Sequence, residues 1–420
     1  MVLASEQPTS ADRLYAWCVV AMLWMVCFFN YADRQAIFSL FPLLHTGLGL
    51  TPFQLGIVGS SFMWMYAISG PIAGWFSDRI SPRTVVLSAL AFWSVVTAGT
   101  ALSHSYATLI AFRTLGGLGE AFYFPAAMAL IGSYHGAETR SRAMAFHQTS
   151  VYAGTITGGA MAGIIGERSG WRASFVIFGV LGVVLALVLI YFLRPIKQSA
   201  SLSSSNAARD FFRSTRSVLR SGSVIVMVAV FIGANFVAIV FLTWLPTFLL
   251  VKFHMSLGSA GVNSTVYLQI ASVIGVLLGG FLADRFAKAT PGGRQMIQAI
   301  GLLCGVPFIF LTGWSLTLAG LIIGMIGFGF FKGMYDANIW ASLYDVIPVE
   351  QRGTAAGLMN SLGWLGGGFA PIVIATAAQH FGLGACLSAT SAIYLLLALI
   401  LFGLALHLRK SGSCATLSVI

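Results

Sequence analysis

Apolar runs of membrane-spanning length dominate this chain and leave few folds open to it. A helix needs about 20 mostly apolar residues to cross the hydrocarbon core of a bilayer, and the 420-residue sequence contains twelve such runs. Only 8% of the residues are charged, against about 25% in soluble proteins, so a water-soluble enzyme or a nucleic-acid-binding protein is excluded. We therefore predict an all-α integral membrane protein with twelve transmembrane helices. The predicted spans are residues 15–38, 53–76, 84–102, 107–133, 141–166, 173–193, 223–250, 259–284, 295–315, 317–346, 353–378 and 383–408.

The basic residues indicate how the chain is oriented in the membrane. Lys and Arg are enriched in the cytoplasmic loops of membrane proteins. If both termini and the even-numbered loops share one side, that side holds 17 Lys and Arg, the other side holds 3, and three lie within spans. We predict cytoplasmic termini in a multi-pass protein of a bacterial-type inner (plasma) membrane. The net charge of +11 then reflects topology and not a nucleic-acid partner.

A Ser-rich, basic stretch over residues 195–222 divides the chain in two. It contains no apolar run of spanning length, so it predicts a cytoplasmic linker between a six-helix bundle over 1–194 and a second, pseudo-symmetric one over 223–420. The five cysteines and seven histidines are scattered, without the spacing of a disulfide framework or a metal site. We expect no metal, no cofactor, no enzymatic activity and a monomeric state.

Two charged motifs recur in the two halves of the chain. A Gly-x-x-x-Asp-Arg motif ends the second and the eighth span, with its aspartates 206 residues apart. A Glu-x-Arg motif precedes the fifth and the eleventh span, at an offset of 212 residues. Parallel repeats of this kind are a known plan of membrane proteins, and ordinary topology-setting charge is the alternative interpretation. We predict a cytoplasmic gate formed by Gly74, Asp78, Arg79, Arg83 and Arg140 in the first half and by Asp284, Arg285 and Arg352 in the second.

Six charged side chains lie inside predicted spans and away from their ends, where each costs about 3 kcal/mol or more to insert. Their charges sum to zero, and buried ion pairs stabilise a fold poorly compared with apolar packing. A functional site is therefore favoured, while a network that only fixes helix packing stays open as the alternative. The six residues are Asp33 and Arg34 in the first span, Arg113 and Glu120 in the fourth, and Lys332 and Asp336 in the tenth.

The spacing of these residues predicts where their partners lie. Arg113 and Glu120 are two helical turns apart, so they share one helix face about 10 Å apart along the axis. Lys332 and Asp336 stand at i and i+4, so they can pair directly. The two adjacent residues of the first span point about 100° apart, and each is expected to find a partner on another helix.

The chemistry of these side chains indicates an anion and a proton. An arginine guanidinium binds a carboxylate in bidentate fashion, so cations in a cavity favour an anionic solute. Desolvation favours the neutral form of a carboxyl group and a nearby arginine favours its charged form, so the pair can take up and release a proton. Our hypothesis is that Asp33 and Glu120 occupy Arg34 and Arg113 when deprotonated. Protonation would then release the arginines to the carboxylate of the substrate.

The run Gly74-Trp-Phe-Ser-Asp78-Arg79, followed by Arg83, resembles the loop signature of the major facilitator superfamily, and the likeness covers residues 15–408. Within that superfamily the chain is most similar to the anion:cation symporters, which import sugar acids such as hexuronates and galactonate with protons. This closer resemblance rests on Asn30-Tyr31-Ala-Asp33-Arg34, on Ser61-Phe62 through Tyr66, and on the run from Arg113 through Glu120 to Pro125.

The resemblance implies both a fold and the roles of the membrane charges. The expected fold is the major facilitator fold, whose first, fourth, seventh and tenth spans line a central cavity. Arg34 and Arg113 would bind the substrate carboxylate. Asp33 and Glu120 would carry the proton.

The resemblance also implies contacts outside the charge cluster. Tyr31 and Tyr66 would line the first half of the site, and Asn360 would contact substrate hydroxyls from the second half. Lys332 and Asp336 depart from the family pattern and indicate a second anionic group or another coupling site, so we assign Lys332 to the substrate and Asp336 to the proton. Other aromatic or amide side chains that could shape the cavity are Trp64, Tyr123, Gln148, Tyr152, Tyr335, Asn338 and Trp364.

We therefore predict a secondary active transporter that performs proton-coupled symport of a small organic anion by alternating access. A spinster-like lysolipid or amphiphile transporter is the first alternative, because that family shares the Asp-Arg pair of the first span and the Glu of the fourth. A non-transporting sensor or receptor on the same scaffold is the second alternative and a membrane enzyme the third, and an anion exchanger or exporter on the same fold also stays open. The partners we expect are the anionic solute, a proton and the lipid bilayer.

Overall fold

The computed structural model describes residues 10–77, 79–136, 138–195, 215–348 and 351–417, and every regular element in these ranges is a helix. The first half of the chain forms α1 (Ser10–Ser39), α2 (Phe41–Leu48), α3 (Pro52–Ser77), α4 (Pro82–Thr100), α5 (Tyr106–Ala121), α6 (Tyr123–Tyr134) and α7 (Arg140–Phe192). The second half forms α9 (Gly222–Phe253), α10 (Leu257–Ala289), α11 (Gly293–Trp314), α12 (Leu318–Asp336), α13 (Ile339–Asp345), α14 (Arg352–Gly367), α15 (Ala370–Phe381) and α16 (Leu383–Leu417).

The long helix α7 accounts for two of the twelve predicted spans. Within the described residues, eleven segments are long and apolar enough to cross a membrane, and one of them covers 51 residues of α7. A straight helix of that length would extend about 75 Å, more than twice the hydrocarbon thickness. The chain turns back at Gly170, whose φ of 80° and ψ of 163° are open only to glycine. The prediction of twelve spans is therefore confirmed, with a single-residue kink where the sequence led us to expect a loop over 167–172.

Three of the spans are interrupted, and two of the interruptions lie beside membrane charges. The fourth span breaks at Phe122, between α5 and α6, and the tenth breaks between α12 and α13. The eleventh breaks between α14 and α15. Broken helices at membrane depth are tolerated where they line a cavity or are buried in protein, so these breaks direct attention to the centre of the molecule.

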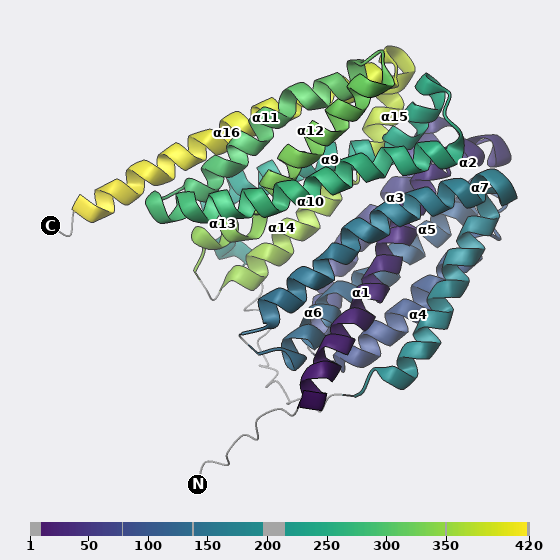
Figure 1. Cartoon of the computed structure of the whole chain (residues 1–420), viewed down its shortest axis with the longest axis horizontal. Coiled ribbons are helices and arrows are strands. Elements are labelled where there is room, and N and C mark those ends of the chain that lie inside the picture. Colours follow the sequence, from purple (N-terminus) through teal and green to yellow (C-terminus); the bar gives the residue numbers. More distant parts are fainter. Residues whose placement is uncertain (1–9, 78, 137, 196–214, 349–350, 418–420) are drawn as a thin grey trace, which may run out of the picture.

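The two groups of helices meet at the end of the molecule that carries α2 and the Gly170 kink, and they diverge toward the end at which both termini lie (Figure 1). At the closed end, Glu167 Oε2 of α7 accepts a hydrogen bond of 2.8 Å from the backbone N–H of Gly258 in α10. A Cβ at Gly163 would stand 2.7 Å from the carbonyl oxygen of Leu257, so only glycine allows this close approach. The structure is thus closed between the halves at one end and open at the other.

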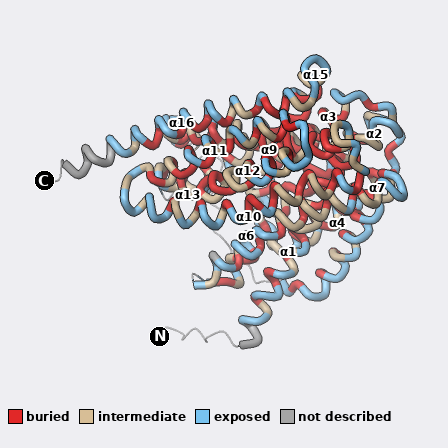
Figure 2. Tube along the Cα trace, turned by 45° about the horizontal axis from the view of Figure 1, so that its top comes forward, coloured by how far each residue is buried: buried red, intermediate tan, exposed pale blue. Residues whose placement is uncertain are grey.

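Burial follows the expectation for a membrane protein. Buried positions face the spaces between helices, whereas the outer surface is exposed (Figure 2). Many large apolar side chains are exposed on that surface, among them Leu277, Phe281 and Tyr191. Such a surface suits contact with lipid. The predicted division into 1–194, linker and 223–420 stays a prediction, because residues 196–214 of the linker lie outside the described part of the chain.

Candidate functional site

A cavity of about 480 Å³ lies between the two halves, lined by α1, α3 and α7 of the first and by α9, α10, α12, α13 and α14 of the second. Its volume falls within the range of about 300–1,000 Å³ that is usual for small-molecule sites. Five of the substrate-binding and proton-coupling residues predicted from the sequence line it. They are Tyr31, Arg34, Lys332, Asp336 and Asn360.

Arg34 lines the cavity and is a buried cation bound to a buried carboxylate. Its Nη2 donates to Glu120 Oε2 at 2.9 Å and to Asn30 Oδ1 at 3.2 Å, and its Nε also donates to Glu120 Oε2 at 3.3 Å. The side chains of Arg34 and Glu120 are only 7% and 2% exposed. Its Nη1 has no hydrogen-bond partner among the described residues. The guanidinium is therefore held from one side and keeps donors available for another acceptor.

Four aromatic rings surround the Arg34 guanidinium. Its Cζ lies 4.6 Å from the ring centre of Tyr66, 4.7 Å from Tyr31, 4.9 Å from Trp364 and 5.1 Å from Phe62. Stacking of this kind stabilises a cation that has lost its water, by about 2 kcal/mol when desolvated. Trp364 comes from α14, so the second half of the molecule contributes directly to the environment of a first-half arginine. Tyr66 reaches Arg34 although it does not line the cavity.

Asp33 and Arg113 lie behind the cavity wall. Thr97 Oγ1 of α4 donates to Asp33 Oδ2 at 3.2 Å, so the predicted partner on another helix is present. The Cζ of Arg113 lies 4.5 Å from the ring centre of Phe62, whose ring is also within reach of Arg34. Within the described residues, no ion pair joins Arg113 to a carboxylate, and its Nε and Nη2 have no hydrogen-bond partner. Phe62 thus separates the two arginines that the sequence assigned to one task.

The start of α5 fixes the register of this part of the site. Ser105 caps the helix, since its Oγ accepts from the backbone N–H of Thr108 at 3.3 Å while Thr108 Oγ1 accepts from the N–H of Ser105 at 3.2 Å. Such reciprocal capping satisfies two donors that a helix N-terminus leaves free. From this start, Arg113 and Glu120 follow two turns apart on one face of α5, and both are buried.

Lys332 and Asp336 form an ion pair within a single turn of α12, as their spacing predicts. Both side chains line the cavity, with exposed fractions of 16% and 24%. Asp336 is the last residue of α12, directly before the break in the tenth span. Their pairing differs from that of Arg34 and Glu120, which belong to different helices.

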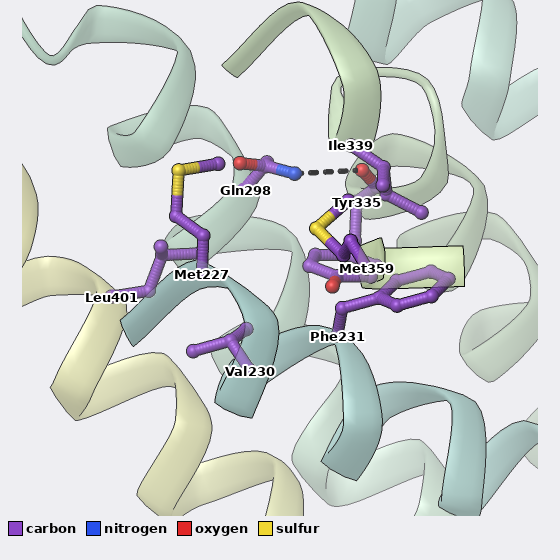
Figure 3. A pocket seen from close by; sticks show the side chains of 8 residues that line it. All are labelled: Met227, Val230, Phe231, Gln298, Tyr335, Ile339, Met359 and Leu401. Carbon is purple, nitrogen blue, oxygen red and sulfur yellow. Dashed lines mark hydrogen bonds between the residues drawn. The ribbon is translucent and has the colours of Figure 1, made fainter. Parts of the chain in front are cut away.

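A second, much smaller cavity lies beside the first, inside the second half (Figure 3). Its volume of about 10 Å³ is at the lower limit for one water molecule. Gln298 Nε2 donates to the backbone oxygen of Tyr335 across it at 3.3 Å. The other lining residues are apolar: Met227, Val230, Phe231, Ile339, Met359 and Leu401. This cavity is a packing gap, and Tyr335 lines both it and the main cavity.

The remaining aromatic and amide candidates divide into two groups. Gln148, Tyr152, Tyr335 and Trp364 line the main cavity. The others serve helix packing: Tyr123 donates to the carbonyl of Leu23, Asn338 to the carbonyl of Gly279, and Trp64 to the carbonyl of Leu365 across the two halves.

Sequence analysis missed five polar or amphipathic residues of the cavity wall: Gln35, Thr155, Asn235, Gln269 and Trp340. Asn235 was detectable in principle, because it is an amide within the strongly apolar α9. Gln35 follows the Asp-Arg pair directly and donates to the carbonyl of Leu242 in the other half at 3.0 Å. Apart from Asn235, nothing in the sequence distinguishes these residues from ordinary packing residues.

The predicted gate residues of the first half bind within that half. Arg83 donates to the carbonyls of Leu193 and Ile190 at the end of α7. Arg140 donates to the carbonyl of His135 at 3.2 Å. Arg79 is exposed and Gly74 lies in the last turn of α3, whereas Asp78 lies outside the described residues. Arginines at helix C-termini satisfy carbonyls that the helix leaves free.

The gate residues of the second half include an ion triad. Arg294 lies between Asp284 and Asp345, at 2.9 and 2.8 Å, so it is the partner of the repeated motif despite its displaced position in sequence. Arg352 donates to the carbonyl of Tyr344 at 3.1 Å, and Arg285 is exposed. Asp345 escaped prediction because only the folded chain brings it beside α10 and α11. The four ion pairs of the described residues each lie within one half, which agrees with the open end seen in Figure 1.

Comparison with known proteins gives concordant results. The family profile of the Major Facilitator Superfamily matches residues 23–371 and 252–413. The hexuronate transporter of Bacillus subtilis (strain 168) is 26% identical over 354 residues, which cover 82% of this chain and 83% of that protein. The probable galactarate/D-glucarate transporter GudP of the same organism is 26% identical over 404 residues, covering 88% and 87%.

Solved structures share the fold. The crystal structure of a bacterial homolog of the human lysosomal transporter Spinster, in an inward-facing and unoccupied conformation, superposes with a TM-score of 0.82. Its sequence identity is 19%, and the match covers 96% of this chain and 98% of that one. At this identity the likeness establishes the arrangement of helices.

Proposed function

The chain belongs to the Major Facilitator Superfamily, and from that premise we propose that this membrane transporter moves a small organic anion, a sugar acid or another carboxylate, together with a proton. The family and the fold are those of transporters and not of enzymes. The sequence relatives named above carry hexuronate and, as a probable assignment, galactarate and glucarate. These names support the choice of an organic anion as the solute.

The observation that carries the proposal is the position of Arg34. It lines the cavity, it is bound to Glu120 of another helix, and its Nη1 has no partner among the described residues. A buried guanidinium with free donors in a cavity suits a carboxylate, because a bidentate charge-assisted contact is strong at low dielectric. A neutral solute would leave that charge uncompensated when Glu120 is protonated.

Protonation of Glu120 provides the coupling step. The deprotonated carboxylate holds the Arg34 guanidinium through Nη2 and Nε. A proton on Glu120 neutralises that carboxylate, so the Arg34 guanidinium binds the substrate carboxylate instead. The cluster remains neutral because the substrate brings one negative charge and the proton one positive charge. Solute and proton therefore bind together, since either one alone leaves an unbalanced charge in a low-dielectric site.

Asp33 and Arg113 complete the cluster behind the wall. Asp33 is proposed as a second proton-coupling group, because it is a buried carboxylate bound to one hydroxyl group, that of Thr97. Arg113 is proposed to reach the substrate carboxylate in a state in which the Phe62 ring has turned aside, since that ring now lies 4.5 Å from it. Together with Arg34, it balances the charges of Asp33 on α1 and Glu120 on α5 when both carboxylates are deprotonated.

The other side chains of the cavity wall suit a polyhydroxylated solute. We propose that Tyr31 and Tyr66 position the Arg34 guanidinium by stacking and that Asn360 contacts substrate hydroxyls from α14. Twelve of the 27 lining residues carry a hydroxyl, amide or charged group. A lysolipid or amphiphile transporter is the alternative on the same fold, and this polar lining favours the hydrophilic solute over it.

The transport cycle follows from the two ends of the molecule. With both termini in the cytoplasm of a bacterial-type cell, the open end faces inward and the end closed by Glu167 faces outward. We propose that the motif residues on the cytoplasmic side, Asp78 among them, exchange their contacts when that side closes. Import as a monomer fits these features, and export or exchange would use the same site in the opposite direction.

Uptake into proteoliposomes tests the proposal. Purified protein would be given radiolabelled glucuronate, galactonate, a lysophospholipid and an uncharged sugar, each with and without an inwardly directed proton gradient. The proposal predicts accumulation of an organic acid that depends on the gradient and is abolished by a protonophore. Gradient-independent uptake of the lysophospholipid alone would favour the alternative.

A further inference from the structure

The fourth and tenth spans break at corresponding positions. These spans are the first helices of the second three-helix unit in each half, and Glu120 and Asp336 are 216 residues apart, close to the 206 and 212 residues that separate the repeated motifs. Glu120 is the last residue but one of α5, and Asp336 is the last of α12. Each half therefore carries one acidic side chain where its helix is interrupted.

Each of these carboxylates is bound to a cation that lines the same cavity. Glu120 holds Arg34 on the first-half wall, and Asp336 holds Lys332 on the second-half wall. The other ionisable side chains that line the cavity are the phenols of Tyr31, Tyr152 and Tyr335. The two halves thus offer two cation–carboxylate pairs to one solute.

We propose that the substrate is a dianion with an acidic group at each end, which binds Arg34 with one carboxylate and Lys332 with the other. This inference rests on the proposed function and names its substrate class: six-carbon dicarboxylic sugar acids are preferred over the corresponding monocarboxylic acids. A dianion that bridges the cavity forms an ion pair with each half of the molecule. A monoanion bound to Arg34 forms an ion pair with the first half alone.

Charge balance then fixes the number of protons. The six membrane charges sum to zero without solute, and burial of a net charge in the bilayer is costly. A monoanion that displaces Glu120 from Arg34 brings one proton to the first-half cluster, where Glu120 and Asp33 are the proton-coupling carboxylates. A dianion also displaces Asp336 from Lys332 and brings a second proton to it. Transport is electroneutral in both cases, with one proton for each carboxylate of the solute.

The rest of the cavity lining suits the remainder of such a molecule. Amide side chains from three helices line the wall, namely Gln148 of α7, Gln269 of α10 and Asn360 of α14. Amide groups both donate and accept hydrogen bonds, as the hydroxyl groups of a sugar acid require. The cavity of about 480 Å³ exceeds the volume of a six-carbon chain and leaves room for water.

The experiment compares galactarate, galactonate and galactitol, which share a six-carbon polyol chain and carry two, one and no carboxylates. Purified protein in proteoliposomes is given an inside-alkaline gradient of one pH unit with the membrane potential clamped at zero. One coupled proton gives accumulation of about 10-fold and two give about 100-fold, because one pH unit corresponds to about 1.4 kcal/mol per proton. We expect about 100-fold for galactarate, about 10-fold for galactonate and none for galactitol.

Three variants locate the second carboxylate. Lys332→Gln is expected to lower the ratio of galactarate to galactonate uptake by at least about 10-fold, and the charge-neutral pair Lys332→Gln with Asp336→Asn should give the same result. Asp336→Asn alone removes one proton site, so galactarate accumulation should fall to about 10-fold and become sensitive to the membrane potential. Lys288→Gln, at an exposed lysine near the end of α10, is the matched control.

The outcomes separate this inference from the proposed function. Accumulation of galactonate without galactarate uptake, or equal accumulation of both, overturns the dianion and leaves proton-coupled anion transport intact. A loss of both uptakes to the same degree in Lys332→Gln and in the double variant also overturns it. Absence of gradient-driven uptake of galactarate and galactonate by the unmodified protein overturns this inference, and the proposed function is overturned as well if glucuronate and the other carboxylates tested are not accumulated either.

Discussion

The two halves of the molecule hold their membrane charges in different ways. In the first half, Arg34 of α1 binds Glu120 of α5, so the pair depends on how two helices lie against each other. In the second half, Lys332 and Asp336 belong to one turn of α12, and the pair persists wherever that helix moves. An ion pair between two helices can be broken when the helices move relative to each other. An ion pair within one helix is broken only when a ligand or a proton binds to one of its members.

This difference suggests that the two ion pairs have different roles in transport. The first-half pair is buried and surrounded by four rings, so breaking it requires a new partner for each member. The second-half pair is more exposed and has no such enclosure in its described contacts. We expect the first half to carry the obligatory coupling step and the second half to set which anion is preferred.

Arg34→Gln should have the largest effect on uptake. The substitution leaves Glu120 buried without its cation, which costs about 3–5 kcal/mol, and it removes the bidentate donor for the substrate. Initial rates of organic-acid uptake in proteoliposomes should fall by about 100-fold or more. Arg34→Lys keeps the charge without the forked geometry and should recover only part of the rate. Uptake at the wild-type rate by Arg34→Gln would contradict the assignment of the obligatory coupling step to the first half.

Arg113→Ala should reduce uptake almost as strongly as Arg34→Gln, although this residue lies behind the wall. Without its charge, the cluster of Asp33, Arg34 and Glu120 carries a net negative charge that repels an anion. Arg113→Lys retains the charge and is the matched control. The uptake rates of both variants and their binding of the acid, measured by calorimetry, distinguish a role of the charge from a role of the hydrogen bonds of Arg113. Normal uptake by Arg113→Ala would show that the residue serves only helix packing.

Trp364→Ala tests the one aromatic contact that crosses from the second half to Arg34. Its ring lies 4.9 Å from the guanidinium, and loss of a desolvated cation–π contact costs about 1–2 kcal/mol. The KM for the organic acid should rise by about 10-fold, whereas Trp364→Phe should stay within about 3-fold of the wild type. An equal rise in both variants would mean that ring size and not stacking is important.

Asp284→Asn should have the smallest effect. Asp284 is 68% exposed in its contact with Arg294, and exposed ion pairs contribute about 1 kcal/mol or less. The melting temperature of the detergent-solubilised protein should fall by no more than about 4 °C. A strong loss of transport with unchanged stability would instead assign this ion triad a place in the closing of the cytoplasmic side.

The sequence predicted those features that depend on local spacing. The apolar runs predicted the twelve spans, the i, i+4 spacing predicted the Lys332–Asp336 pair, and the superfamily resemblance is confirmed by the family match. Features that depend on tertiary contacts escaped prediction. Examples are the Phe62 ring between the two arginines and the triad completed by Asp345, because each joins helices that are far apart in the chain.

Proton coupling through Glu120 is the central claim, and Glu120→Gln tests it most directly. Glutamine resembles the protonated carboxyl group in shape and lacks its charge, so it leaves Arg34 available to the substrate at every pH. Counterflow exchange and gradient-driven accumulation of the same radiolabelled acid would be measured on one proteoliposome preparation. We predict that exchange continues while accumulation against the gradient is lost. Normal accumulation by Glu120→Gln would contradict the coupling mechanism.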